Sequence, residues 1–206
     1  MTAPVTAPVT ATAHAPTLDG SYVPDDVRKA VAVVEDMLGA FARLPAYLVY
    51  RTVYDNVPAD KYRVMRYVHS ITNHALAILC DEGRCRVVLP SGLNMRITRN
   101  AGRGRLAAML PIDTMVYAVP GTAYASGDRM FPMATYVWAI LDEARVPLAS
   151  AEVRRRFAER TGTERYLSSV IKTLVDKHLV YSTRVGRSAF IWAMTTGDES
   201  VARHFR

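Results

Sequence analysis

The hydrophobic pattern of one segment near the C-terminus changes its period abruptly, and this change limits the folds open to the chain. Up to His178, apolar residues recur at i, i+3, i+4 and i+7, a spacing that places them on one face of a helix. These residues are Leu167, Val170, Ile171 and Leu174. After His178, apolar and polar residues alternate as in a strand, and Gly186 supplies a turn. The segment therefore predicts a helix followed directly by a β-hairpin.

Two further helices are expected upstream of this segment. Pro132 suits a first helical turn and precedes an apolar stripe that ends at Leu141. Ser150 is a suitable N-cap for the next helix, in which Val153 and Phe157 lie one turn apart. A short connection that contains glycine joins this helix to the third one, as in a helix-turn-helix.

The order of three helices and a hairpin resembles the winged helix-turn-helix superfamily. Residues 167–192, LSSVIKTLVDKHLVYSTRVGRSAFIW, carry most of the resemblance, which covers about a third of the chain. The resemblance implies a winged helix-turn-helix domain over residues 129–196. Within it, a recognition helix is expected over residues 163–177, with Thr163 as its N-cap, and a wing over residues 179–194.

Polar and basic side chains cover the sides of these elements that the apolar stripes leave exposed. Such side chains reach base edges and phosphates from a helix in the major groove, and a hairpin tip reaches the backbone or the minor groove. The candidate DNA-binding residues are Arg154, Arg155, Thr163, Arg165, Tyr166, Ser168, Ser169, Lys172, Arg184 and Arg187. Residues 131–194 contain ten Lys or Arg against six Asp or Glu, a surplus that favours a polyanion as partner. An ordinary solvated basic face is the alternative.

The expected fold class is α+β, with an N-terminal α/β domain that contains a hairpin. Residues 1–16 repeat the motif TAPV and have almost no charged or bulky side chains, so we expect a disordered tail over residues 1–20. The N-terminal domain is expected over residues 24–110. Residues 111–128 contain Pro, Gly and Ser and are expected to be a linker, within which residues 115–119, MVYAV, fit a short strand. Residues 197–206 are expected to be a C-terminal tail.

Three segments of the N-terminal domain each leave alternatives open. Helical spacing predicts a helix over residues 24–41 that forms core, a dimerisation surface or both. Residues 47–56 fit a strand or a buried helix equally well. Residues 62–89 repeat the C-terminal order of a Tyr, a His twelve residues later, an apolar run and a Gly-Arg turn. They predict either a second, divergent winged helix, with residues 62–73 as its third helix and residues 75–89 as its wing, or an unrelated α+β domain with a central hairpin.

A basic segment follows in this half. Its residues Arg96, Arg99, Arg103 and Arg105 are secondary DNA-binding candidates. A narrow minor groove admits extended arginines beside glycine, and phosphates attract them in any sequence. A solvated basic loop is the alternative.

No catalytic or metal-binding motif is recognisable in the sequence. Cys80 and Cys85, with His69 and His74 upstream, match no zinc-site spacing and are interpreted as structural residues. The chain contains no phosphate-binding loop, dinucleotide fingerprint or nucleophile elbow. We therefore expect no enzymatic activity, no metal and no cofactor. Two cysteines, no secretory signal and no apolar run of about 18 residues predict a cytoplasmic protein without membrane contact.

The net charge of +7 and the pI near 9.6 agree with a nucleic-acid partner. The sequence thus predicts a homodimeric, sequence-specific double-stranded DNA-binding protein that regulates transcription. One alternative is a plasmid- or phage-type replication initiator with tandem winged helices. Another is a protein-protein interaction or structural module that uses a winged helix without DNA. The sequence indicates no particular small-molecule effector.

Overall fold

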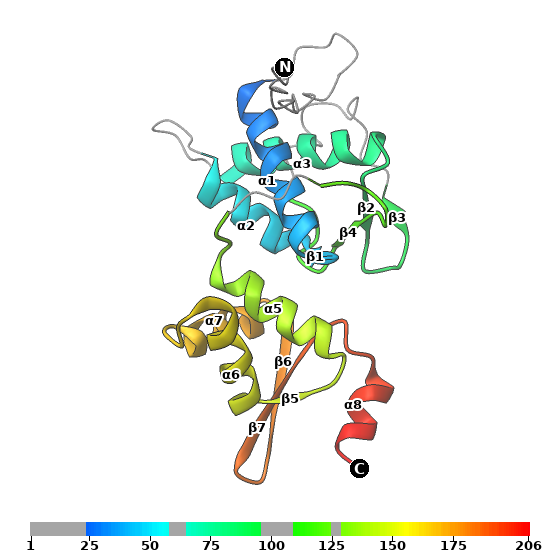
Figure 1. Ribbon diagram of the computed structural model, residues 1–206. Helices are drawn as coiled ribbons and strands as arrows, with labels where there is room; N and C mark the ends of the chain where they lie inside the picture. The colour runs from blue at the N-terminus through cyan, green and yellow to red at the C-terminus, as the bar shows by residue number, and fades with distance from the viewer. Residues whose placement is uncertain (1–23, 58–64, 96–108, 125–128) are drawn as a thin grey trace, which may run out of the picture.

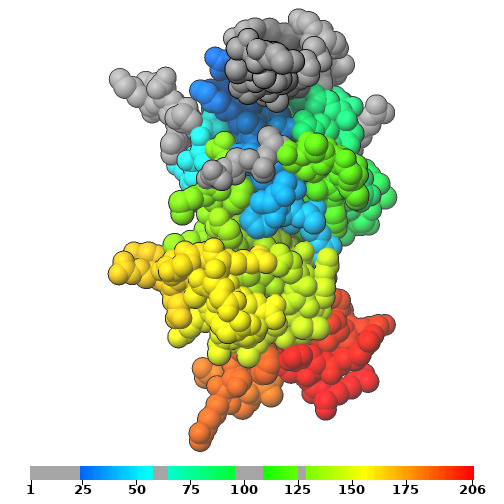
Figure 2. Space-filling model, viewed as in Figure 1, coloured from blue at the N-terminus to red at the C-terminus, as the bar shows by residue number. Residues whose placement is uncertain are grey.

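The computed structural model describes residues 24–57, 65–95, 109–124 and 129–206, which form seven helices and two antiparallel sheets. Two halves lie end to end: one holds the described residues from 24 to 124, and the other holds those from 133 onward (Figures 1 and 2). The predicted α+β class is confirmed at this level. The predicted tail at residues 1–20 and the arginines Arg96, Arg99, Arg103 and Arg105 lie outside the described residues.

The first half packs three helices beside one sheet. Its elements are α1 (Asp25–Ala40), β1 (Arg43–Pro45), α2 (Ala46–Asn56), α3 (Met65–Asp81), β2 (Cys85–Val88), β3 (Asn94–Met95) and β4 (Met115–Ala118). The strand order is β1-β4-β2-β3, with every pair antiparallel. α1 places an apolar stripe against α2 and α3, and its Val34 and Met37 are completely buried. The predicted core role of this helix is thus confirmed, whereas a dimerisation role stays a prediction.

The second half is a three-stranded sheet with helices against it. Its elements are α5 (Met133–Ala144), β5 (Leu148–Ala149), α6 (Ser150–Thr161), α7 (Leu167–Asp176), β6 (Val180–Val185), β7 (Ser188–Ala193) and α8 (Asp198–His204). The strand order is β5-β7-β6, again antiparallel. Trp138 and Phe157 are fully buried and supply the largest side chains of this core.

The two halves repeat one order of elements. Each half runs in the order helix, short strand, helix, helix, strand and strand. In each sheet, the last of these three strands lies between the two earlier ones. Thus β4 pairs with β1 and β2, as β7 pairs with β5 and β6. The first half differs by the added strand β3 and by the long connection between β2 and β4.

Two expectations for the first half are settled by its helices. Residues 47–56, which fitted a strand or a helix, belong to helix α2. The predicted division into a helix at 62–73 and a hairpin at 75–89 is wrong, because α3 continues to Asp81 and contains all of the apolar run 75–79. That run is buried all round, so it shows no polar face and no period from which a helix could be recognised.

The segments expected to be a linker and a tail both contain regular elements, and the short strand that MVYAV fits is present as β4. The predicted linker at 111–128 is wrong for its centre, because β4 pairs on both sides within the first sheet. The predicted tail at 197–206 contains α8, which begins after Gly197 with two acidic residues and ends with basic ones, in accord with the helix dipole. Aromatic contacts with β7 hold this short helix in place.

Polar contacts join the halves. Arg43 of β1 donates two hydrogen bonds to the Asp142 carboxylate of α5, at 2.9 and 2.8 Å. Arg129, just before α5, donates to Asp36 of α1 at 2.7 Å and to Asn56 of α2 at 3.1 Å. The end of α7 also contacts the first half, as described below.

Among the described helices, none combines the length and the apolar character needed to cross a membrane.

Candidate nucleic-acid interface

Helix α7 begins later than the sequence predicted. Its first residue is Leu167, and Tyr166 precedes it in a left-handed conformation with φ of 63°. Thr163 is therefore not the N-cap; its hydroxyl accepts a hydrogen bond from the backbone N–H of Arg165 at 3.1 Å, inside the turn. Likewise, the N-cap position of α6 is occupied by Ala149, which has no side chain that could cap the helix. Ser150 is the first residue of the helix, so the predicted Ser150 cap is wrong. Arg165 and Tyr166 project from the turn rather than from the helix.

The two faces of α7 have the predicted character. Leu167 and Leu174 are buried, and Val170 and Ile171 pack against the core beside them. The opposite face is exposed and carries Ser168, Ser169, Lys172 and Thr173. The Ser169 hydroxyl donates to the Tyr166 carbonyl at 2.7 Å, and the Thr173 hydroxyl donates to the Ser169 carbonyl at 3.0 Å. The hydroxyl oxygens of Ser169 and Thr173 can each still accept a hydrogen bond from a group on the solvent side.

The β6–β7 hairpin extends beyond the body of the second half (Figures 1 and 2). Residues 181–188, which form most of β6 and the turn, are exposed on both sides of the hairpin. Val185 pairs with Ser188 at the tip, and Gly186 adopts a φ of 59°, which glycine accepts without strain. Arg184 and Arg187 flank this turn. The hairpin predicted over residues 179–194 is therefore present with nearly the predicted bounds.

Aromatic rings brace the base of the hairpin. Tyr181 and Trp192 are cross-strand partners with ring centroids 6.3 Å apart. Phe205, which follows α8, contacts Phe190 at 5.3 Å and Trp192 at 6.2 Å. Sequence reasoning missed this contribution of Phe205, for which a single aromatic residue near the end of the chain is a weak signal. The contacts stiffen the hairpin where it leaves the domain.

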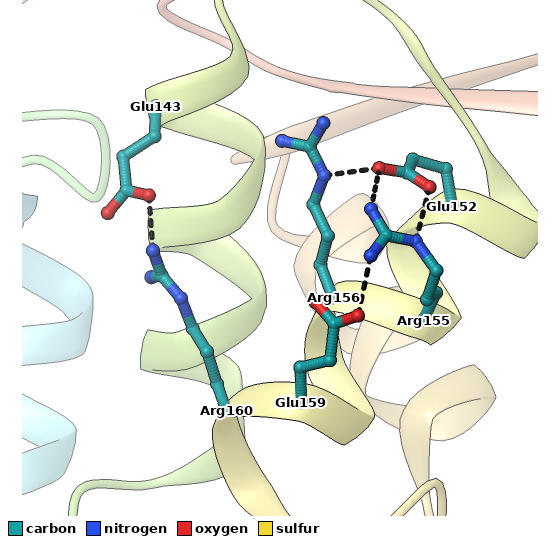
Figure 3. A network of polar contacts seen from close by, with 6 residues as sticks. All are labelled: Glu143, Glu152, Arg155, Arg156, Glu159 and Arg160. Atoms are coloured by element: carbon teal, nitrogen blue, oxygen red, sulfur yellow. Dashed lines mark hydrogen bonds and ion pairs between the residues drawn. The ribbon is translucent and has the colours of Figure 1, made fainter.

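Arginines on α6 are occupied by glutamates (Figure 3). Arg155 donates to Glu152, with Nε at 2.9 Å, and also to Glu159. Arg156 donates to the same Glu152 at 2.6 Å. These two guanidinium groups hold the pKa of Glu152 down at about 2. Arg160 pairs with Glu143 of α5.

Arg154 was, like Arg155, a predicted DNA-binding residue. Its Nε lies 3.7 Å from a carboxylate oxygen of Glu164. Both predicted residues on α6 are thus beside carboxylates that cancel much of their charge.

Four other cations have no such partner. Across the described ranges, no ion pair involves Arg165, Lys172, Arg184 or Arg187, and all four are exposed. They come from the turn before α7, from α7 itself and from the hairpin tip. Residues 163–188 hold five Lys or Arg against two acidic residues, so this surface keeps a positive surplus of three. We call Arg165, Lys172, Arg184 and Arg187 the unpaired cation set.

The helix at the equivalent place in the first half offers no comparable surface. In α3 the residues from Ile71 to Leu79 are buried, except the half-buried His74. Its exposed side chains are confined to its ends. The two halves thus share an order of elements but not an exposed polar helix face.

The thiols of the chain form a separate pair. Cys80 Sγ at the end of α3 lies 3.2 Å from Cys85 Sγ at the start of β2. Hydrogen bonding between them lowers the pKa of Cys80 and, with burial, raises that of Cys85. Within the described residues, no three His, Cys, Asp or Glu side chains gather as metal ligands would.

No protein-family model matches the sequence, and comparisons with curated proteins and with solved structures found no match. Any functional conclusion therefore depends on the surface described above.

Proposed function

We propose that the chain is a sequence-specific double-stranded DNA-binding protein that regulates transcription, with residues 129–196 as a winged helix-turn-helix domain. The order helix, strand, helix, helix, hairpin and the strand order β5-β7-β6 support this fold. A fold alone does not define a function, so the proposal depends on the surface of α7 and the hairpin.

The observation that carries the proposal is the unpaired cation set. Basic side chains that already hold carboxylates contribute little net charge to a surface, whereas unpaired ones attract phosphates and release counterions on binding. The contrast with α6 is internal to the domain: Arg155, Arg156 and Arg160 are matched by glutamates, while the four cations around α7 and the hairpin are not.

The geometry suggests a division of work. α7 would enter the major groove, where Ser168, Ser169 and Lys172 reach base edges and phosphates. Arg165 and Tyr166, which precede the helix, would contact the backbone at its N-terminal end. The hairpin would follow the duplex, with Arg184 and Arg187 on the backbone or in the minor groove. Arg154 and Arg155 have a smaller share in this proposal than the sequence assigned to them, because both lie beside glutamates.

Selection from a pool of random duplexes tests the proposal with the full chain. Bound duplexes are sequenced after selection at low and at moderate salt. We expect one motif to be enriched at both concentrations, and Lys172→Ala to reduce its enrichment. Retention of duplexes without any enriched motif would contradict sequence-specific reading, and no retention at low salt would contradict DNA binding. In the latter case, capture of a protein partner that does not respond to salt would favour an interaction module.

A second candidate function is favoured by the repeated order of elements. A plasmid- or phage-type replication initiator with tandem winged helices would contact DNA through both halves. Because α3 is largely buried, the first half would have to use segments other than that helix. Footprinting separates the candidates: one monomer protecting two unequal sites supports the initiator, whereas two symmetric half-sites support a dimeric regulator.

The proposed regulator is a homodimer. This part of the proposal depends on the general match between two-fold proteins and paired half-sites. Light scattering of the free protein and of the complex with its selected duplex measures the stoichiometry. Two chains on each duplex support the homodimer, and one chain contradicts it.

A further inference from the structure

A cavity of about 410 Å³ lies beside α2 and α3 and includes one side chain from the second half. Its volume falls in the range of small-molecule sites, which is roughly 300–1,000 Å³. α2 contributes Tyr47, Tyr50, Arg51 and Tyr54, α3 contributes His69, and the residue after α7 contributes Lys177. Among the described residues that line the cavity, none is Asp or Glu.

Aromatic rings make up one side of the cavity. Tyr47, Tyr50 and Tyr54 follow one another at i, i+3 and i+7, so they lie on one face of α2. Tyr50 is fixed in place, because its hydroxyl donates to Asn73 and accepts from the Leu110 N–H at 3.0 Å. Tyrosine rings on one helix face suit a flat, aromatic ligand.

The cationic side of the cavity is not neutralised. Lys177 Nζ lies 5.8 Å from the centroid of the Tyr47 ring and, over the described parts of the chain, enters no ion pair. Arg51 differs, because its Nε donates to Asp55 at 3.2 Å. One positive charge therefore faces the cavity without a carboxylate, and one negative charge on a ligand would balance it.

A buried polar atom also lacks a partner at this site. His69 Nε2 is shielded from solvent and has no hydrogen-bond partner in the described structure. The His69 ring packs edge-on against Tyr50, with centroids 5.1 Å apart. The His69 ring thus lines the cavity, while its Nε2 is closed to water.

We propose that this cavity binds a small aromatic carboxylate, with its ring against the α2 tyrosines and its carboxylate on Lys177. Among the described lining residues, one cation is unbalanced and fits a monoanion, whereas a nucleotide would bring at least two negative charges to one lysine. The binding site does not depend on DNA recognition, so it stands or fails independently of the proposed function.

Calorimetric titration of the full chain, without DNA, tests the site with 2-naphthoate as the probe. Two matched compounds separate the contributions: 2-naphthylmethanol keeps the rings without the charge, and cyclohexanecarboxylate keeps the charge without an aromatic ring. We expect saturable binding of 2-naphthoate with a stoichiometry of about one per chain, and much weaker binding of both controls.

Variants then identify the site. Lys177→Met keeps the length of the side chain and removes its charge, and it is expected to weaken 2-naphthoate binding about tenfold or more, the value of one charge-assisted contact. Tyr47→Leu is expected to weaken binding as well, while Lys29→Met, on α1 and outside the cavity, leaves it unchanged. The proposal is overturned if 2-naphthoate does not bind, if it binds no more tightly than 2-naphthylmethanol, or if Lys177→Met binds it like the native chain.

Discussion

Arg43 and Asp142 are 99 residues apart in the sequence and form a two-point ion pair that fastens β1 of the first half to α5 of the second. Their side chains retain only 16% and 10% exposure, so solvent screens the pair weakly. Asp142 also accepts a hydrogen bond from Thr195, which follows β7. This single carboxylate thus links three parts of the fold.

Arg43→Ala is expected to destabilise the protein by about 3 kcal/mol, because it leaves the Asp142 carboxylate buried without its main partner. Denaturant unfolding measures the change. The matched control is Arg51→Ala, which removes an arginine from an exposed pair with Asp55 and is expected to cost less than about 1 kcal/mol. Equal losses of unfolding free energy in the two variants would show that the Arg43–Asp142 pair stabilises the protein no more than an exposed ion pair does.

Stability is expected to fall as the pH drops below about 6.5, in part through His69. Burial lowers the pKa of His69 from its ordinary value of 6.5, so the unfolded chain binds a proton more readily than the folded one does. The contribution of the neutral ring is complete above 6.5 and is lost as the pH falls through the folded-state pKa. His69→Gln should reduce the difference in unfolding free energy between pH 7.5 and 5.5. An unchanged difference in this variant would contradict the role given to His69.

Cys80 is expected to react with iodoacetamide before Cys85. The hydrogen bond from Cys85 favours the Cys80 thiolate, whose side chain is half-buried, while Cys85 is buried with a raised pKa. Peptide mass spectrometry after brief alkylation gives the order. Cys85→Ser keeps a hydroxyl donor in place and should preserve the reactivity of Cys80, whereas Cys85→Ala should lower it. Faster labelling of Cys85 in the native chain would contradict the assignment.

The second half was predictable where its signals were local. The Leu167 to Leu174 stripe and the alternation after His178 are short-range patterns, and they gave helix α7 and the hairpin with small errors at the ends. The ion pairs of α6 were also readable, since Glu152 precedes Arg155 and Arg156 by three and four residues. Their consequence for the charge of α6 was missed.

The rest required contacts that are distant in the sequence. β4 is a strand because it pairs with β1, some 70 residues before it, and nothing within the segment 111–128 signals that partner. α8 is held by Phe205 against Phe190 and Trp192. The cavity was not predicted either, because the tyrosines at 47, 50 and 54 fitted a strand as well as a helix, and Lys177 joins them only through the packing of the two halves.

We propose that DNA affinity depends on the cations around α7 and the hairpin tip far more than on those of α6. The most direct test is the salt dependence of affinity of the full chain for its selected duplex. It compares Arg184→Ala/Arg187→Ala with Arg155→Ala/Arg156→Ala, two double variants that remove the same number of charges. The account predicts that the hairpin variant binds more weakly and has a log-log salt slope shallower by about 2, while the α6 variant stays close to the native chain. Equal loss in both variants, or an unchanged slope for the hairpin variant, would contradict it.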